Sequence, residues 1–123
     1  MKVKRTILVA EDNDFVRRLL SNILSEDYQV LTAADGVEAA RVFEEHDGRV
    51  EAVVTDIEMP RLDGFRLVER LRRNRPDLPI LIVSSFCRSA VLSKLGERAK
   101  LAVLSKPFEV DELMGVLRGL LEA

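Results

Sequence analysis

Polar side chains that can bind a cation or a phosphoryl group follow four apolar segments of the chain. These side chains are Glu11 and Asp12, Asp56, Ser84, and Lys106. Crowded carboxylates repel one another and need a cation, and a set of carboxylates, a backbone carbonyl and waters suits Mg²⁺. A lysine and a hydroxyl beside a metal-bound carboxylate add the positive charge and the hydrogen-bond donor that a phosphoryl group requires. The set predicts phosphoryl chemistry, with Asp56 as the carboxylate that can act as the nucleophile.

Asp56 stands at the end of the segment that we expect to form the central strand. Residues 52–55 combine two valines with an alanine and a threonine, which favours extended backbone buried on both faces. The strand cannot run far past Asp56, because Pro60 has no backbone N–H. Ligands bind at the carboxyl ends of strands in open α/β sheets. An aspartate in this place can also be a turn former or a helix cap. The polar residues at the ends of the other strands favour a functional role for Asp56 over these structural ones.

Five strand–helix units alternate along the chain without a linker that would divide it. The predicted strands are residues 7–10, 29–32, 52–55, 79–84 and 101–104. Such alternation predicts a parallel sheet with right-handed crossovers and helices on both of its faces. The carboxyl ends of parallel strands share one edge, so the polar side chains should meet there. Taken one at a time, these residues also have non-catalytic interpretations. Lys106 could be a solvated surface lysine, Ser84 could be a hydroxyl at a strand end, and Glu11 and Asp12 could belong to a helix-capping loop.

A helix is expected after each strand, from apolar side chains at helical spacing. The repeating positions are Val16, Leu19, Leu20 and Ile23; Val37, Ala40 and Phe43; Leu67, Val68 and Leu71; Leu92 and Leu95; and Leu113, Val116, Leu117 and Leu120. Asn13, Asp35 and Asp63 are the predicted N-caps of the first three helices. The pair Asp47-Gly48 should end the second helix, and a short fourth helix should end near Gly96.

Composition excludes several classes of protein. The 123 residues are 47% hydrophobic and 33% charged, which predicts one globular domain over residues 1–123. A net charge of −2 provides no basic field for nucleic acid or an anionic membrane. Apolar runs are far shorter than the roughly 20 residues that span a bilayer, and Glu11 and Asp12 interrupt any signal peptide, so a cytoplasmic protein is expected. The single Cys87 excludes an internal disulfide and a cysteine-rich zinc site.

Five pieces of sequence together carry a resemblance to a known family. They are residues 7–12 (ILVAED), residues 54–60 (VTDIEMP), residues 62–64 (LDG), Ser84, and residues 106–108 (KPF). In this combination the chain resembles the receiver domain of bacterial two-component response regulators, over essentially its whole length. The resemblance implies an α/β, single flavodoxin-like (βα)5 domain, with a five-stranded parallel sheet in the order 2-1-3-4-5 and helices on both faces.

The resemblance also implies how the carboxylates would act. Asp56 would accept a phosphoryl group from a sensor histidine kinase or a histidine phosphotransfer protein. Asp12 and Asp56 would bind Mg²⁺ directly, together with the backbone carbonyl of Glu58. Glu11 would act mainly through a metal-bound water.

The remaining implied roles concern the phosphoryl group. Ser84 would donate its hydroxyl to one phosphoryl oxygen, and Lys106 would contact another. The peptide bond between Lys106 and Pro107 is expected to be cis.

The function expected from these roles is a phosphorylation-dependent signalling switch. The domain would catalyse only its own phosphorylation and dephosphorylation, and would pass the signal to an unknown downstream protein. It would act as a monomer or a phosphorylation-dependent dimer, without contacting nucleic acid or a membrane. One alternative is a small Mg²⁺-dependent phosphohydrolase with an aspartyl-phosphate intermediate, although Glu58 is a loose substitute for its second acid. The other is a non-phosphorylated docking module with the same fold.

Three positions depart from the family pattern, and all lie in the segment that usually signals outward. Val103 replaces the usual Tyr or Phe, Ser85 replaces a smaller residue, and Ala99-Lys100 replaces a Gly-Ala pair. Since Val103 has no ring to swing, we predict that activation repacks residues 85–88 and the short fourth helix.

Two other features of the sequence each have two interpretations. Six arginines on and around the third helix favour a solvated face over nucleic-acid binding, because no aromatic residues lie between them. Gly115 and Gly119 lie one turn apart in the last helix, and mark either a close contact or simple tolerance of glycine.

Overall fold

A computed structural model describes residues 4–46, 48–96 and 98–122 of the chain. Its elements are β1 (Thr6–Ala10), α1 (Asp14–Leu24), β2 (Gln29–Ala33), α2 (Gly36–Glu45), β3 (Val50–Asp56), α3 (Gly64–Asn74), β4 (Ile80–Ser84), α4 (Arg88–Leu95), β5 (Leu101–Ser105) and α5 (Val110–Glu122). All five predicted strand–helix units are present in the predicted order. Of the pair expected to end the second helix, Asp47 lies outside the described residues, and Gly48 follows the end of α2 with a φ of 79°.

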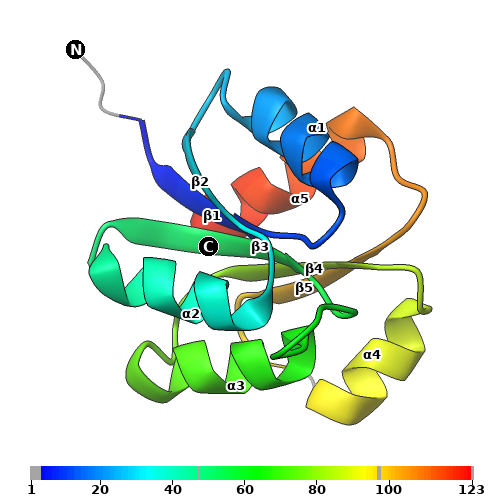
Figure 1. The fold of residues 1–123 in the computed structure, drawn as a ribbon. Coiled ribbons are helices and arrows are strands. Elements are labelled where there is room, and N and C mark those ends of the chain that lie inside the picture. The colour runs from blue at the N-terminus through cyan, green and yellow to red at the C-terminus, as the bar shows by residue number, and fades with distance from the viewer. Residues whose placement is uncertain (1–3, 47, 97, 123) are drawn as a thin grey trace.

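The strands form one parallel sheet in the order β2-β1-β3-β4-β5, which confirms the order that the resemblance implied. Figure 1 shows α1 and α5 on one face of the sheet and α2, α3 and α4 on the other. The central strand β3 lies between β1 and β4. Its last residue, Asp56, therefore comes to the middle of the carboxyl edge. No helix within the described residues is long and apolar enough to cross a membrane.

Two hydrophobic cores, one on each face, hold the helices to the sheet. Alternate residues of β1 divide between them, because successive side chains of a strand point to opposite faces. Ile7 and Val9 pack in the core that includes Leu113 of α5, while Leu8 packs with Leu67 of α3. All of these side chains are fully buried, and each contributes roughly 1.5–3 kcal/mol of hydrophobic stabilisation.

The predicted caps of the first three helices are confirmed. The side-chain oxygens of Asn13, Asp35 and Asp63 each accept a backbone N–H three residues on, at 3.0, 2.8 and 3.0 Å. Each such cap is worth about 1 kcal/mol relative to alanine. These caps fix where α1, α2 and α3 begin, directly after the loops at the carboxyl edge of the sheet.

Two of the positions that repeat at helical spacing do not face the core. Leu19 of α1 is 47% exposed and Val37 of α2 is 39% exposed. The core contacts of α1 come from Leu20 and Leu24 instead. Helical spacing identifies an apolar stripe but not its buried width, because that width depends on how closely the helix sits on the sheet.

Candidate functional site

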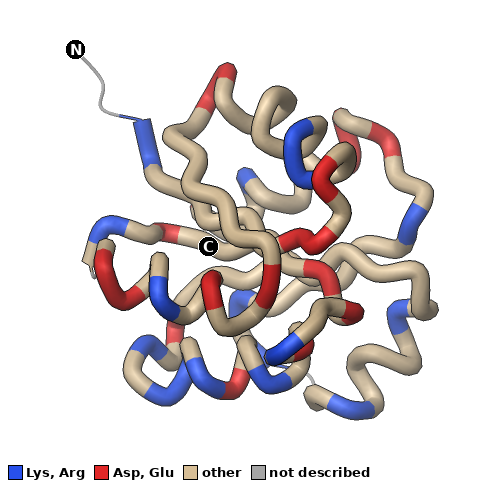
Figure 2. Tube along the Cα trace, viewed as in Figure 1, with Lys and Arg blue, Asp and Glu red and all other residues tan. Residues whose placement is uncertain are grey.

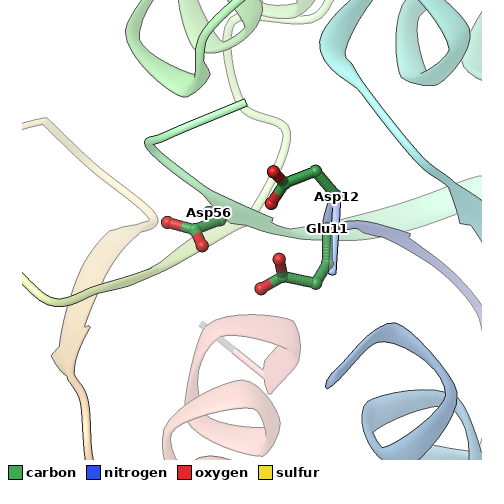
Figure 3. A group of neighbouring side chains, drawn as sticks. All are labelled: Glu11, Asp12 and Asp56. Carbon is green, nitrogen blue, oxygen red and sulfur yellow. The ribbon is translucent and has the colours of Figure 1, made fainter. Parts of the chain in front are cut away.

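Three carboxylates converge at the carboxyl edge of the sheet. Glu11 and Asp12 come directly after β1, and Asp56 is the last residue of the neighbouring β3. One carboxylate oxygen from each residue lies within 4.8 Å of the others. Figure 3 shows the three side chains gathered at this edge of the sheet. The structure thus brings together the three carboxylates that the sequence predicted as metal ligands.

The two carboxylates after β1 lie in different surroundings. Glu11 is only 2% exposed, and its oxygens accept hydrogen bonds from the backbone N–H of Asn13 at 3.0 Å and from the Lys106 ammonium at 3.3 Å. Burial raises the pKa of the Glu11 carboxyl above its usual value. The neighbouring Asp12 is exposed, and within the described residues its carboxylate accepts no hydrogen bond. Asp12 therefore has the oxygens most available to a cation.

Asp56 is 9% exposed and has both oxygens engaged. Its Oδ1 accepts hydrogen bonds from the backbone N–H groups of Ile57 at 2.6 Å and Glu58 at 3.3 Å. Its Oδ2 accepts one from the Lys106 ammonium at 2.8 Å. Burial alone would lower the pKa of Lys106, but its hydrogen bonds and ion pairs with Asp56 and Glu11 outweigh burial and raise that pKa. Lys106 is thus held as a cation against two carboxylates.

Ser84 lies at the end of β4, next to Asp56 on the paired strand β3. It is almost completely buried, and its Oγ accepts a hydrogen bond from the backbone N–H of Phe86 at 3.0 Å. The following Ser85 donates to the exposed carboxylate of Glu58 at 3.4 Å. The predicted hydroxyl is therefore at the correct edge, but it is bonded to its own loop rather than to the carboxylates.

The loop between β3 and α3 is held by two close backbone contacts. A Cβ built on Gly64 would lie 2.3 Å from the carbonyl oxygen of Asp56, and one built on Gly36 would lie 1.8 Å from that of Leu62. No side chain fits at either place. The Gly64 N–H also donates to the carbonyl of Ile57 at 2.8 Å. Gly64 belongs to the segment of residues 62–64 that carried the family resemblance. Nothing in the sequence had marked Gly36 as a position of close contact.

An ion pair also fixes this loop, and sequence reasoning missed it. Arg61 has a φ of 67° and donates to both carboxylate oxygens of Asp35, at distances from 2.8 to 3.0 Å. The capping bond to Glu38 and the Arg61 guanidinium together lower the pKa of Asp35. Asp35 was expected only as a helix cap. The two residues are 26 positions apart, so no local pattern could pair them.

The chain also turns sharply at Lys106. The Lys106–Pro107 peptide bond is cis, as predicted, and the backbone N–H of Lys106 donates to the carbonyl of Ser84 at 2.8 Å. This bond continues the pairing of β4 with β5 as far as the site. Lys106 is then placed to reach Asp56 from two strands away.

The arrangement defines a class of protein. Three carboxylates and one lysine crowd the switch-point edge of a doubly wound parallel sheet, which is where such folds bind ligands. The donor set is all oxygen, with more negative charge than one lysine neutralises, and this fits a hard divalent cation such as Mg²⁺. The class is that of doubly wound α/β proteins with an acidic pocket at the switch point of the sheet.

Comparison with known proteins identifies the family. The model of the response regulator receiver domain matches residues 7–118, so the chain belongs to the family of two-component receiver domains. The α/β sheet order and the expected signalling role are thereby confirmed.

Relatives of the chain include both kinases and response regulators. The sensor kinase CckA of Brucella abortus is 38% identical over 118 residues, which are 95% of this chain and 12% of that protein. The response regulator MprA of a Mycobacterium species is 39% identical over 118 residues, which are 94% of this chain and 50% of that protein. The chain therefore spans half or less of these curated relatives.

A similar solved structure is that of the response regulator TrrA from Thermotoga maritima, in complex with Mg²⁺ and beryllium fluoride. It is 30% identical, with a TM-score of 0.81, and the match covers 94% of this chain and 98% of that one.

Proposed function

We propose that this receiver domain accepts a phosphoryl group on Asp56 in a Mg²⁺-dependent reaction and so switches a partner-binding surface. The observation that carries the proposal is the contact of Lys106 with Asp56 at 2.8 Å, inside a cluster of three carboxylates. Phosphorylation would form a bond between an Asp56 oxygen and phosphorus and break the bond from phosphorus to the donor histidine. The released imidazole nitrogen takes up a proton. Hydrolysis by water returns the free carboxylate and inorganic phosphate.

The chain supplies ligands that would hold the metal. Asp12 and Asp56 would bind it through their carboxylates, and Glu58 through its backbone carbonyl. Glu11 has both oxygens engaged by Asn13 and Lys106, which supports a role through a bound water. When bound, Mg²⁺ neutralises the carboxylates and draws charge from the phosphoryl oxygens.

Two side chains would contact the phosphoryl group itself. Lys106 already faces Asp56, and its ammonium would pair with a phosphoryl oxygen. The Ser84 hydroxyl would turn from the backbone of Phe86 to donate to another phosphoryl oxygen. The domain that carries this reaction would extend over residues 1–123.

The phosphodonor would be a sensor histidine kinase or a histidine phosphotransfer protein, acting in the cytoplasm where ATP supplies the phosphoryl group. Phe15 is 74% exposed in the first turn of α1, three residues after Asp12, and Leu19 lies one turn further along. Exposed apolar side chains beside a site suit the docking of a protein. A monomer or a phosphorylation-dependent dimer remains the expected state.

The test is phosphorylation by a small donor. With Mg²⁺ and acetyl phosphate, the intact protein should gain one phosphoryl group by mass spectrometry, and Asp56→Asn should gain none. The amide is nearly isosteric but is a poor nucleophile, so the fold should persist. The matched control is Asp27→Asn, an exposed aspartate in the turn after α1, which should label like the natural chain.

Other outcomes favour the alternatives. Labelling of Asp56→Asn at the natural rate would contradict the acceptor assignment. Steady turnover of p-nitrophenyl phosphate would favour a phosphohydrolase. Absence of both labelling and Mg²⁺ binding would favour a non-phosphorylated docking module.

A further inference from the structure

A groove with an apolar floor runs between α3 and α4. It encloses about 610 Å³, and its apolar lining is Leu62, Phe65 and Leu95. Leu62 and Phe65 are only half-buried, although they pack against the core of that face. This volume lies in the range of about 300–1,000 Å³ that binding sites occupy. The groove lies across the sheet from α1, where the proposed phosphodonor docks (Figure 1).

The rim of this groove is basic. Arg66, Arg70 and Arg73 of α3 and Lys94 of α4 line it, against the single acidic residue Glu69. Figure 2 shows basic positions along α3 and on α4 in the lower part of the view. The groove therefore carries positive charge on a chain whose net charge is −2.

The arginines around α3 divide into two groups, and only one of them lies on the expected solvated face. Arg72 is buried and donates to the carbonyls of Leu78, Ala99 and Lys100. Arg75 donates to the carbonyl of Val50. These two arginines serve the fold.

The groove arginines are exposed and little compensated. The Glu69 carboxylate pairs with Arg98 at 2.6 Å, so it does not neutralise the rim. Arg70 has only a long contact with Glu44 at 3.5 Å, and no ion pair of Arg66 or Arg73 occurs within the described residues. The Lys94 ammonium lies over the Phe65 ring, 4.5 Å from its centroid. Acidic groups entering the groove would meet unneutralised cations above an apolar floor.

We propose that this groove binds an acidic amphipathic helix of a protein partner. Arg66, Arg70 and Arg73 follow one another at i, i+4 and i+7, which places them about 10 Å apart from first to last along one side of α3. Carboxylates at the same spacing on a partner helix match all three at once, and leucines beside them fill the floor. A small anion would reach only part of the row.

One feature of the groove disfavours nucleic acid as the occupant. The one aromatic side chain lining the groove, Phe65, is covered by Lys94 and offers no open ring on which a base can stack.

The experiment titrates the protein with a synthetic helical peptide that carries glutamates at i, i+4 and i+7 and leucines at the adjoining positions. Backbone amide shifts should concentrate on α3 and α4. The double variant Arg66→Glu/Arg73→Glu should weaken binding about tenfold or more, because both contacts become repulsive. The matched control Arg18→Glu/Arg118→Glu makes the same charge change at two exposed arginines of α1 and α5, and should leave binding unchanged. Circular dichroism confirms that each variant is folded.

A second peptide separates a docking groove from simple charge attraction. It keeps the glutamates and replaces the leucines by serines, and it should bind at least about tenfold more weakly, since the apolar floor is left unfilled. The proposal is overturned if this peptide binds equally well, if the shifts fall outside α3 and α4, or if duplex DNA displaces the first peptide at the same salt concentration. None of these measurements needs Asp56 to be phosphorylated, so the result stands apart from the proposed function.

Discussion

Two of the three carboxylates at the site, Glu11 and Asp56, share one lysine, and the surroundings of all three divide their roles. Glu11 is buried and bonded through both oxygens, while Asp12 is exposed and its carboxylate accepts no hydrogen bond within the described residues. A cation that enters the cluster gains most from the carboxylate that still has free lone pairs. The pair of adjacent acids is therefore chemically asymmetric even though both follow the same strand.

This asymmetry predicts the effect of removing each acid. Glu11→Ala should weaken Mg²⁺ binding by about tenfold, and Asp12→Ala should weaken it more, because a direct ligand contributes more than one acting through water. Isothermal titration with MgCl₂ measures both. A larger loss for Glu11→Ala would mean that the two roles are exchanged.

At the scale of elements, the join between β3 and α3 depends on a glycine. Gly64 starts α3 so close to Asp56 that a Cβ would lie 2.3 Å from the Asp56 carbonyl oxygen. By contrast, among the described residues no atom outside the local backbone of α5 lies within 4 Å of a Cβ built on Gly115 or Gly119. Of the two explanations for those helical glycines, simple tolerance is the one that the structure supports.

The two kinds of glycine should respond oppositely to alanine. Gly64→Ala should lower the free energy of unfolding by about 2 kcal/mol or more, because the strand end and helix start must move apart. Gly115→Ala should raise it by about 0.5–1 kcal/mol through helix propensity. Urea unfolding measures both, and a neutral Gly64→Ala would contradict the close contact.

The short helix α4 is the element most suited to switching. It has eight residues, and its N-cap Cys87 makes no side-chain capping bond. The loop before it is held by the hydrogen bond from the Phe86 N–H to the Ser84 hydroxyl. Helices of this length are marginal without tertiary support. On β5, Val103 is buried and has no ring to swing. We therefore expect the link from the site to α4 to run through the Ser84 hydroxyl.

Activation should accordingly change residues 85–96 first. With Mg²⁺ and beryllofluoride, a stable mimic of the phosphoryl group, the Ser84 hydroxyl should release the Phe86 N–H. Backbone amide shifts should concentrate in that loop and α4, while Val103 keeps its rotamer. Phe86, which is 46% exposed, is the expected aromatic reporter. The prediction fails if the loop is unchanged while β5 and α5 rearrange.

Over the whole molecule, two arginines tie separate segments together. Arg61 pairs with Asp35 at the start of α2, and the buried Arg72 binds the carbonyls of Ala99 and Lys100 before β5. Both contacts join segments that lie at least 26 residues apart. The Arg61 contact couples the loop beside the site to the stability of the fold, whereas the Arg72 contacts hold the amino ends of β4 and β5.

The Asp35 contact should make stability depend on pH. Its pKa is lowered from 3.8 in the folded protein, so its contribution is complete above that value and is lost as the pH falls through the folded pKa. Asp35→Ala should lower the free energy of unfolding by about 1 kcal/mol at pH 7, through the lost cap. The difference between variant and natural chain should shrink below about pH 4. A difference that stays constant down to pH 3 would show that the charge of Asp35 contributes nothing.

The sequence by itself determined the order of strands and helices, the caps at Asn13, Asp35 and Asp63, and the residues that lie at the carboxyl edge. These features follow from side-chain periodicity and from residues next to one another in the chain. A parallel sheet then brings every strand end to the same edge, so Asp56 and Lys106 could be placed together before any contact was known.

Only the tertiary structure decided which side chains touch. It paired Lys106 with Asp56, buried Glu11 while exposing Asp12, and joined Arg61 to Asp35. It also turned Arg72 inward while leaving Arg70 and Arg73 of the same helix at the surface. Such pairings depend on the distance and angle between elements that are remote in sequence, which packing sets and no local pattern records.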